Sequence, residues 1–453
     1  MHNGKRGSFS GKLGYVLAAA GSAVGLGNIW RFPYLAAKYG GGAFLLVYIV
    51  LALTFGYAMI MAETALGRMT RKSPVGAFAS FSGKKSVRAG GWINAIIPLL
   101  IVPYYSVIGG WVCRYLWGYV SGHGVEMAAD GAFDAFLGNP LATELCFVAF
   151  AAMTMLVIFG GVRNGIEKVS KVMMPILALL TLVVVGYSVT RPGAMAGVRY
   201  FLVPDLRHFS LMTLVSALGQ MFYSLSIAMG ILITFGSYTG RDVDVEGTTV
   251  QVEIFDTAIA VLAGLMVIPA VFAFSGGDPA ALNKGPALMF VTLPRVFESM
   301  GGAWAGTLFF LLVLMAALTS SVSLAESVCS TFEDELGLSR RKSAALLSVL
   351  LVALGTLSCL GFNLLGRVKP LGMDILSFFD FLTNSVMMPV AAAATCLLVL
   401  KVVGLKRLED EITSSSAFKR RGVFRFVIRY LALALLAVIL VSSILDAFGL
   451  IHI

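Results

Sequence analysis

Residues 21–28 read GSAVGLGN, and they interrupt the first long apolar segment of the chain, residues 12–37. Three glycines and one asparagine therefore stand near the middle of a segment that is otherwise apolar. Each interior glycine lowers helix propensity by roughly 1 kcal/mol relative to alanine. If the segment crosses a membrane, backbone that leaves the helix at this depth is tolerated only where protein encloses it around a cavity.

The composition indicates that the segment does cross a membrane. Of the 453 residues 58% are hydrophobic and 13% are charged, whereas soluble domains are about 45–50% apolar and about 25% charged. Uninterrupted apolar runs such as Phe44 to Met61 suit helices of about 20 residues that span the bilayer, and they exclude the weak alternation of an outer-membrane barrel. The predicted fold class is an all-α polytopic membrane protein.

Apolar runs between breaker residues predict about eleven transmembrane helices in one transporter domain, residues 1–453. Their expected ranges are residues 12–37, 42–69, 91–120, 142–160, 166–189, 211–238, 251–274, 303–335, 343–362, 373–400 and 424–448. The first repeat would span about 12–189 and the second about 211–400, with an extra helix at about 424–448. The first helix lacks a cleavage site after it, so we expect it to be retained and not removed as a signal peptide.

The basic residues predict the orientation of these helices. Six Lys and Arg lie between Arg68 and Arg88 and seven between Lys401 and Arg425. Placing these segments in the cytoplasm satisfies the positive-inside rule, so we expect a cytoplasmic N-terminus and an outer C-terminus. The net charge of +10 is interpreted as this topology signal and not as a nucleic-acid surface. Compact loops without an Asn-X-Ser/Thr sequon suit a bacterial inner membrane.

A second interrupted helix lies five helices after the first. Residues 224–230 read SLSIAMG, which again places small and hydroxyl-bearing residues at mid-depth. A matched pair of broken helices, one in each half, indicates a five-plus-five inverted repeat of a secondary transporter with its site at the midplane. The alternative is close helix packing, because Gly21 and Gly25 also form a GxxxG motif.

Other classes of function find little support in the sequence. The chain contains no HExxH, GxSxG or P-loop motif, so we expect no enzyme and no organic cofactor. A channel would more often be an oligomer with a ring of pore-lining residues. A membrane sensor that binds without transporting, or a carrier coupled to protons, remains open.

The histidines and cysteines give no sign of a catalytic or metal site. All four histidines lie in predicted loops or tails: His2, His123, His208 and His452. The five cysteines are interpreted as buried thiols: Cys113, Cys146, Cys329, Cys359 and Cys396.

The segment GLGNIWRFPY, residues 25–34, resembles the first-helix signature of the neurotransmitter:sodium symporter family. Further similar motifs follow in order along ten helices: GGGAF at 40–44, ETALGR at 63–68, YY at 104–105, GIEK at 165–168, GQ at 219–220, LTSS at 318–321 and FEDEL at 332–336. Many members have twelve helices, whereas this sequence predicts eleven, as in some bacterial members. The resemblance implies sodium-coupled import of an amino acid by alternating access, without an obligatory protein partner.

The resemblance also implies two sodium sites. Sodium is a hard cation that prefers oxygen ligands, which the carbonyls of an unwound helix can supply. The first site would use Ala23, Asn28, Ser224 and Asp256, completed by the substrate carboxylate. The second would use Gly21, Val24, Ala316, Thr319 and Ser320. Alternatively, the hydroxyls of Thr319 and Ser320 could bond back to carbonyls of the preceding turn.

Asp256 departs from the family pattern, which usually has asparagine at this position, and Ala260 stands where a chloride-binding serine would be expected. An ionised side chain in mid-membrane costs about 2.5–3.5 kcal/mol on insertion scales and needs a partner. Our hypothesis is that Asp256 supplies the negative charge that chloride supplies elsewhere, which would make transport chloride-independent and open a proton-coupled return step. The alternative is a protonated Asp256 that imitates asparagine.

Glu63 is the other acid near the membrane centre. The resemblance implies that it accepts hydrogen bonds from the exposed backbone of the broken helices. The alternative is a glutamate that extends to the membrane surface.

The resemblance places the substrate between the two broken helices. Amide groups of Leu26 and Gly27 would meet its carboxylate, helped by the hydroxyl of Tyr105. The full expected set is Ala23, Leu26, Gly27, Ile101, Tyr105, Tyr223, Ser224, Ser226, Met229, Ser320 and Leu324. No charged residue would face the substrate side chain, which predicts a neutral hydrophobic or aromatic L-amino acid. Ala228, where relatives often have glycine, leaves its size open.

The resemblance also implies an outer and an inner gate. The outer gate would pair Arg31 with Asp380 and Gln220. The inner gate would pair Arg6 with Asp334 beside Phe9 and Tyr238. Without the resemblance, Arg6 and Asp334 could equally be topology and helix-end charges.

Overall fold

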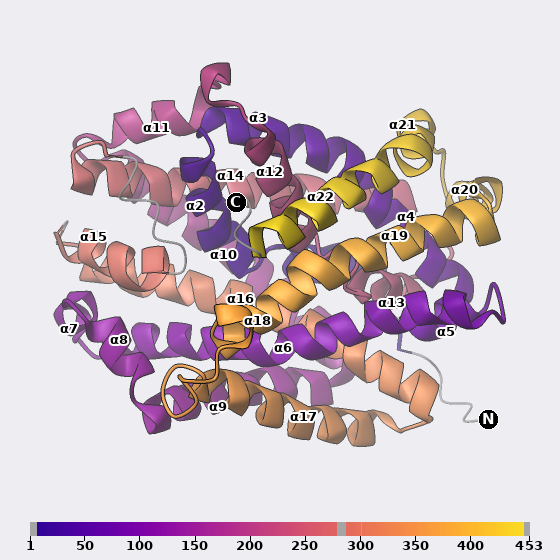
Figure 1. Ribbon diagram of the computed structural model, residues 1–453, viewed down its shortest axis with the longest axis horizontal. Helices are drawn as coiled ribbons and strands as arrows, with labels where there is room; N and C mark the ends of the chain where they lie inside the picture. The colour runs from indigo at the N-terminus through magenta and orange to yellow at the C-terminus, as the bar shows by residue number, and fades with distance from the viewer. Residues whose placement is uncertain (1–6, 279–286, 300, 448–453) are drawn as a thin grey trace.

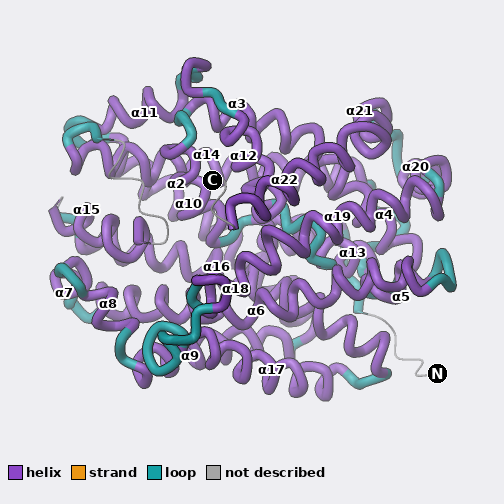
Figure 2. The backbone as a smooth tube through the Cα atoms, in the orientation of Figure 1, coloured by secondary structure: helices purple, strands orange, loops and turns teal. Residues whose placement is uncertain are grey.

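The computed structural model describes residues 7–278, 287–299 and 301–447. Helices dominate these ranges, and the β-pairing described within them is one isolated bridge between Gly41 and Pro204. Figure 1 shows the long helices packed side by side in one bundle, and Figure 2 shows that loops lie mainly at the two ends of the bundle, with further non-helical segments in its interior.

The helices follow one another closely, and several continue into short π-helical turns. Their bounds are α1 Lys12–Ala23, α2 Phe32–Lys38, α3 Gly42–Leu51, α4 Tyr57–Thr70, α5 Pro74–Ala79, α6 Lys85–Val120, α7 Gly124–Ala128, α8 Ala132–Leu137, α9 Pro140–Phe159, α10 Lys168–Val189, α11 Ala194–Leu202, α12 Leu211–Ser224, α13 Ile231–Ser237, α14 Val245–Ser275, α15 Leu293–Ser299, α16 Ala303–Leu336, α17 Arg340–Leu360, α18 Ile375–Asp380, α19 Met388–Leu398, α20 Leu405–Thr413, α21 Arg421–Phe426 and α22 Ala432–Ala447.

The predicted membrane helices agree with these elements to within six residues at each end. Within the described residues, nine continuous helical segments are long and apolar enough to span a bilayer. A tenth span is the pair 12–23 and 27–38, whose two parts meet at a bend of 49°. The remaining predicted span, the sixth at residues 211–238, consists of α12 and α13 with a break between them. The all-α membrane fold with broken helices 1 and 6 is confirmed, whereas the exact limits of the two repeats stay a prediction.

The two ends of the bundle differ in their small helices. In Figure 1, α5, α20 and α21 lie together at one end, which we call the α20 end, and α7, α8, α11 and α15 lie at the other, which we call the α11 end. The basic clusters 68–88 and 401–425 both fall at the α20 end.

Two glycines allow α4 and α13 to pack backbone against backbone. A Cβ atom added to Gly67 would stand 1.9 Å from the carbonyl oxygen of Ile233, and one added to Gly236 would stand 2.3 Å from that of Thr64. Because α13 is the second half of the broken helix, this contact fixes its position against the continuous helix α4.

Buried ion pairs hold α20 and α21 against the bundle. Arg68 of α4 is fully buried and pairs through Nε with Glu411 at 2.7 Å. Glu409 lies on α20, as Glu411 does, and accepts hydrogen bonds from Arg421 and Arg425. Burial alone would raise the pKa of Glu409, but the hydrogen bonds from the two arginines outweigh burial and leave this pKa below its ordinary value.

The α4–α13 contact makes a specific prediction. Gly67→Ala should lower the free energy of unfolding in detergent by about 1–3 kcal/mol, because rigid backbone leaves no room for the methyl group. Gly186→Ala is the matched control, since Gly186 lies inside α10 and an added Cβ would meet nothing within 4 Å. Thermal unfolding measures both variants. Equal stability of Gly67→Ala and Gly186→Ala would contradict the close contact.

Candidate functional site

The first break separates α1 from the π-helical turn Gly27–Arg31. The helix α1 ends at Ala23, and Val24 takes an extended conformation with φ −76° and ψ 96°. The amide of Leu26 donates to the hydroxyl oxygen of Tyr105 on α6 at 3.2 Å. A donor released by the break is thus satisfied by a side chain from another helix.

Glycine is required at this break because other helices approach the backbone closely. A Cβ atom on Gly25 would stand 2.5 Å from the Ser320 hydroxyl oxygen, and one on Gly27 would stand 2.5 Å from the ring of Tyr223. Ser320 belongs to α16 and Tyr223 to α12. The glycines therefore let three helices meet at one point.

The second break occupies the six residues between α12 and α13. Ser226, Ala228 and Gly230 have φ angles of 56°, 61° and 68°. A left-handed conformation costs a residue with a side chain roughly 1–2 kcal/mol and is free for glycine. Ser226 and Ala228 keep this conformation because side chains from neighbouring helices hold the loop.

Two contacts supply this support. Oε1 of Glu63 on α4, whose side chain is buried, accepts from the amide of Ala228 at 2.9 Å. The hydroxyl of Ser226 donates to the carbonyl of Ser22 at 3.1 Å and lies 3.0 Å from the Ser22 hydroxyl. Glu63 thus contacts the second break as expected, and Ser22 joins the two breaks directly.

A small cavity lies between the two breaks. Its lining consists of Ser22, Ala23, Gly25, Gly27, Asn28, Ile101, Tyr105, Tyr223, Ser224, Ser226, Met229, Ile231, Ser320 and Leu324. Every residue expected to bind substrate lines it except Leu26, whose amide is held by Tyr105. None of the lining residues is charged.

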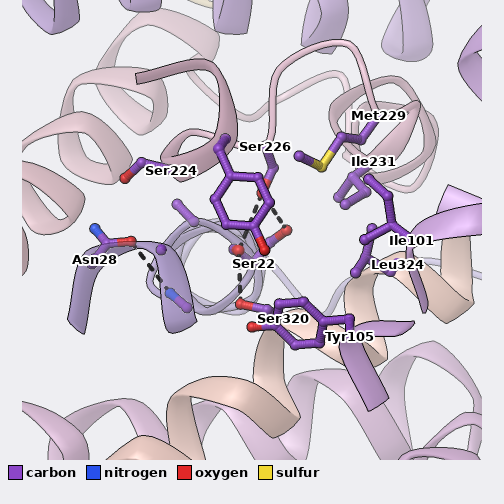
Figure 3. A pocket seen from close by; sticks show the side chains of 14 residues that line it. Ser22, Asn28, Ile101, Tyr105, Ser224, Ser226, Met229, Ile231, Ser320 and Leu324 are labelled. Carbon is purple, nitrogen blue, oxygen red and sulfur yellow. Dashed lines mark hydrogen bonds between the residues drawn. The ribbon is translucent and has the colours of Figure 1, made fainter. Parts of the chain in front are cut away.

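The cavity has a polar and an apolar side. Figure 3 shows Ile101, Leu324, Ile231 and Met229 gathered on one side, and Asn28 and Ser224 on the other. Ser22 and Ser226 lie between them, with Tyr105 and Ser320 along one edge. This distribution of polar and apolar side chains matches a molecule with a polar end and an apolar end.

Beside the polar side lies a buried carboxyl cluster around Asp256 of α14. Oδ1 of Asp256 accepts from Asn28 Nδ2 at 2.7 Å and from the Ser224 hydroxyl at 2.8 Å. Oδ2 accepts from the Tyr48 hydroxyl at 3.0 Å. The structure brings together the three side chains expected at the first sodium site. All three of these donors are neutral.

A second oxygen cluster joins the end of α1 to α16. The Ser320 hydroxyl lies 3.3 Å from the Gly21 carbonyl and 3.4 Å from that of Val24. The Thr319 hydroxyl donates to Ala316 and Met315 carbonyls at 3.1 and 3.2 Å, which is the alternative arrangement considered for this residue. A hydroxyl that donates its hydrogen keeps lone pairs for a cation, so this arrangement is compatible with a sodium ligand.

At the α11 side of the cavity, the expected gate residues make other contacts. The guanidinium of Arg31 lies over the Tyr223 ring, 5.4 Å from its centre. Asp380 accepts from Tyr104 at 3.2 Å and from Asn384 at 2.5 Å. Gln220 donates to the carbonyl of Gly27 at 2.9 Å. Arg31 and Asp380 are therefore held by neighbouring aromatic and amide groups.

At the α20 side, Phe9 and Tyr238 come together as expected. Their rings pack edge to face with centres 6.1 Å apart, and the Phe9 amide donates to the Tyr238 carbonyl at 3.3 Å. Asp334 accepts from the amide of Ser73 at 2.6 Å. Arg6, the expected partner of Asp334, lies outside the described residues.

Sequence reasoning missed Tyr48, Ser22, Gly25 and Ile231. Ser22 and Gly25 lie inside the interrupted segment, so the break itself could have indicated them. Tyr48 sits in an apolar run of α3, where no local pattern separates it from a packing residue.

A comparison with known protein families identifies the family of this chain. The profile described as "Sodium:neurotransmitter symporter family" matches residues 6–123 and 136–450, almost the whole chain. The chain belongs to the sodium:neurotransmitter symporter family. It is therefore a sodium-dependent membrane transporter, and the resemblance of residues 25–34 to the family signature is confirmed.

Several relatives in this symporter family are similar along most of their length. The uncharacterized sodium-dependent transporter YhdH of Bacillus subtilis is 36% identical over 419 residues, which cover 91% of each chain. The uncharacterized sodium-dependent transporter MJ1319 of Methanocaldococcus jannaschii is 31% identical, covering 92% of this chain and 86% of that one. The human sodium- and chloride-dependent GABA transporter 2 is 26% identical over 92% of this chain and 76% of its own.

A solved structure in the family matches this fold. The crystal structure of MhsT in complex with L-phenylalanine superimposes with a TM-score of 0.88 at 34% identity, covering 97% of this chain and all of the other.

Glu63 gives a prediction about the second break. Glu63→Ala should lower the free energy of unfolding by about 1–3 kcal/mol, because it leaves the buried Ala228 amide without its acceptor. Glu63→Gln keeps a side-chain oxygen at that place, so most of the loss should be recovered. Thermal unfolding of the purified variants measures this. If Glu63→Gln were as unstable as Glu63→Ala, the charge and not the acceptor would be the important property.

Proposed function

We propose that this transporter is a symporter that imports neutral hydrophobic or aromatic L-amino acids together with two sodium ions, without chloride. It would lie in the bacterial inner membrane with its N-terminus and α20 end in the cytoplasm and its C-terminus outside. The observation that carries this proposal is the uncharged cavity between the two breaks, polar on one side and apolar on the other.

The cavity chemistry supports an amino acid. The break at Val24 places Gly27 at the start of a helical turn, where its amide can meet a carboxylate. The Leu26 amide, which donates to Tyr105 in this structure, would join it by exchanging the tyrosine for the substrate. The apolar side, formed by Ile101, Met229 and Leu324, would then receive the side chain. The similar structure MhsT was solved with L-phenylalanine, an amino acid of the class that we propose.

The oxygen clusters support two sodium ions. The first ion would be held by Asn28, Ser224, Asp256 and the Ala23 carbonyl, and the substrate carboxylate would complete its shell. The second would be held by the carbonyls of Gly21, Val24 and Ala316 and the hydroxyls of Thr319 and Ser320. Hard oxygen donors of this kind suit an alkali cation. Sharing of the first ion with the substrate would couple the two movements directly.

The free energy available is sufficient for uptake. Moving one charge is worth about 2.3 kcal/mol per 100 mV, and a tenfold concentration gradient adds about 1.4 kcal/mol. Two sodium ions with a zwitterion therefore provide roughly 7 kcal/mol, or about 10⁵-fold accumulation at the limit.

Uptake into proteoliposomes tests the proposal. An inward sodium gradient should drive accumulation of labelled hydrophobic or aromatic L-amino acids, with equal rates in chloride and gluconate. Dissipating the sodium gradient is the control and should abolish accumulation. Binding without uptake or counterflow would identify a sensor, and uptake driven by a proton gradient alone would identify a differently coupled carrier.

Asp256 is the proposed reason for chloride independence. Asp256→Asn should lower sodium-driven uptake in chloride-free medium at least tenfold, because the cluster loses its negative charge. Adding Ala260→Ser supplies the hydroxyl that the resemblance associates with chloride, so the double variant should regain uptake when chloride is present. Ala260→Ser alone is the control and should stay indifferent to chloride. Unchanged uptake by Asp256→Asn without chloride would show that the carboxylate charge is not needed.

A further inference from the structure

A groove lies on the outside of the bundle near the α20 end, and it shares no lining residue with the substrate cavity. It is formed where the first turns of α6 run beside α19 and the π-helical turn Val399–Val403, with α5 behind them. Figure 1 shows α6 and α19 running alongside each other toward the end where α5 and α20 lie. Its lining residues are Phe78, Ser86, Val87, Gly90, Ala394, Leu397, Leu398, Lys401 and Val402.

The groove has a closed apolar end and an open polar mouth. A Cβ atom on Gly90 would stand 2.8 Å from the Phe78 ring and 3.0 Å from the Ala394 Cβ, so the helices touch at this level. Because α6 and α19 run in opposite directions, Ser86 and Lys401 lie together at the other end of the groove. Between these ends the lining is apolar, and Leu397 and Val402 remain 45% and 38% exposed.

The mouth carries positive charge that the protein does not neutralise. Lys84, Lys85 and Lys401 are exposed. Among the described residues, no carboxylate lies within 4.0 Å of the ammonium group of these three lysines. Arg88 on the next turn pairs with Glu335.

Two acids of the neighbouring helix α20 already have partners, and the backbone near the mouth adds to the positive potential. Glu409 and Glu411 on the neighbouring helix α20 are engaged by arginines. The 36-residue helix α6 begins after Lys84 without a side-chain cap, so its first amides add to the attraction for an anion.

We propose that this groove binds one anionic glycerophospholipid. Its phosphate would lie among Lys84, Lys85 and Lys401, and one acyl chain would lie along Val87, Leu397 and Leu398 toward Gly90. The proposal goes beyond the transport function and does not depend on which amino acid is carried.

The shape and charge of the groove favour this occupant over others. A free phosphate would use the lysines but would leave the apolar floor uncovered. A neutral or zwitterionic lipid would cover the floor but would gain less from three unpaired ammonium groups, each of which adds to the attraction for an anionic headgroup. Basic pockets between helices at the membrane surface are a known kind of site for anionic lipids, and a groove open to the bilayer gives the acyl chain direct access.

Native mass spectrometry of the full chain in detergent tests the proposal with phosphatidylglycerol and phosphatidylcholine at equal concentrations. We expect the wild type to retain one phosphatidylglycerol with about tenfold preference over phosphatidylcholine. The variant Lys85→Ala/Lys401→Ala should lose this preference. Ser86→Trp keeps all three charges and fills the groove from its mouth, so it should lower retention of phosphatidylglycerol as well. Excess inorganic phosphate should displace little of the bound lipid.

The matched control is Lys168→Ala/Lys342→Ala, which removes two exposed lysines at the starts of α10 and α17 and should leave the preference unchanged. Thermal unfolding in detergent verifies that every variant is folded. Equal retention of both lipids by the wild type, or equal preference in Lys85→Ala/Lys401→Ala and the control, would overturn the proposal. Displacement by inorganic phosphate alone would reduce the site to a phosphate site and would overturn it too.

Discussion

The two breaks in the first and sixth spans depend on one constraint: a backbone group that leaves its helix inside a membrane must find another partner. Glu63 accepts from Ala228, and Tyr105 accepts from Leu26. Each partner comes from a continuous helix, α4 or α6, so the straight helices serve as the frame for the interrupted ones. The cavity lies between the two breaks, and Tyr105 is one of its lining residues.

The carboxyl cluster around Asp256 also has partners for its oxygen atoms, but an ionised Asp256 would leave a charge to be balanced. Its three donors, Asn28, Ser224 and Tyr48, are neutral. Hydrogen bonds from neutral donors stabilise a carboxylate, yet a buried charge without an opposite charge remains costly. A sodium ion would remove this cost and a proton would do the same. The cluster therefore favours states in which a cation is bound, which gives a physical basis for coupling between cation and substrate.

Much of the fold could be predicted because the bilayer sets the length and apolarity of each span. Residues 42–69 and 303–335 were predicted to within a residue of their observed ends for this reason. The break at Gly25 was visible because glycine and asparagine are rare choices inside a span. The contacts of Tyr48 and Ile231 could not be predicted, because they depend on which faces of α3 and α13 turn inward. The contact of Arg31 with the Tyr223 ring, in place of Asp380, likewise depends on side-chain conformation and not on residue type.

The strengths of the contacts at the α20 end suggest which elements hold and which move. Arg68 with Glu411, and Arg340 with Glu326, are ion pairs with at least one buried partner, and breaking such a pair costs about 3–5 kcal/mol. Phe9 is held by one amide hydrogen bond and by ring contacts, each worth about 0.5–1.5 kcal/mol. Ser10 adds hydrogen bonds to Glu167, so a swing of the start of α1 would break these contacts and leave the ion pairs of α4, α16 and α20 in place. Since the first span is already broken at Val24, α1 can move without displacing the turn Gly27–Arg31 that contacts the cavity.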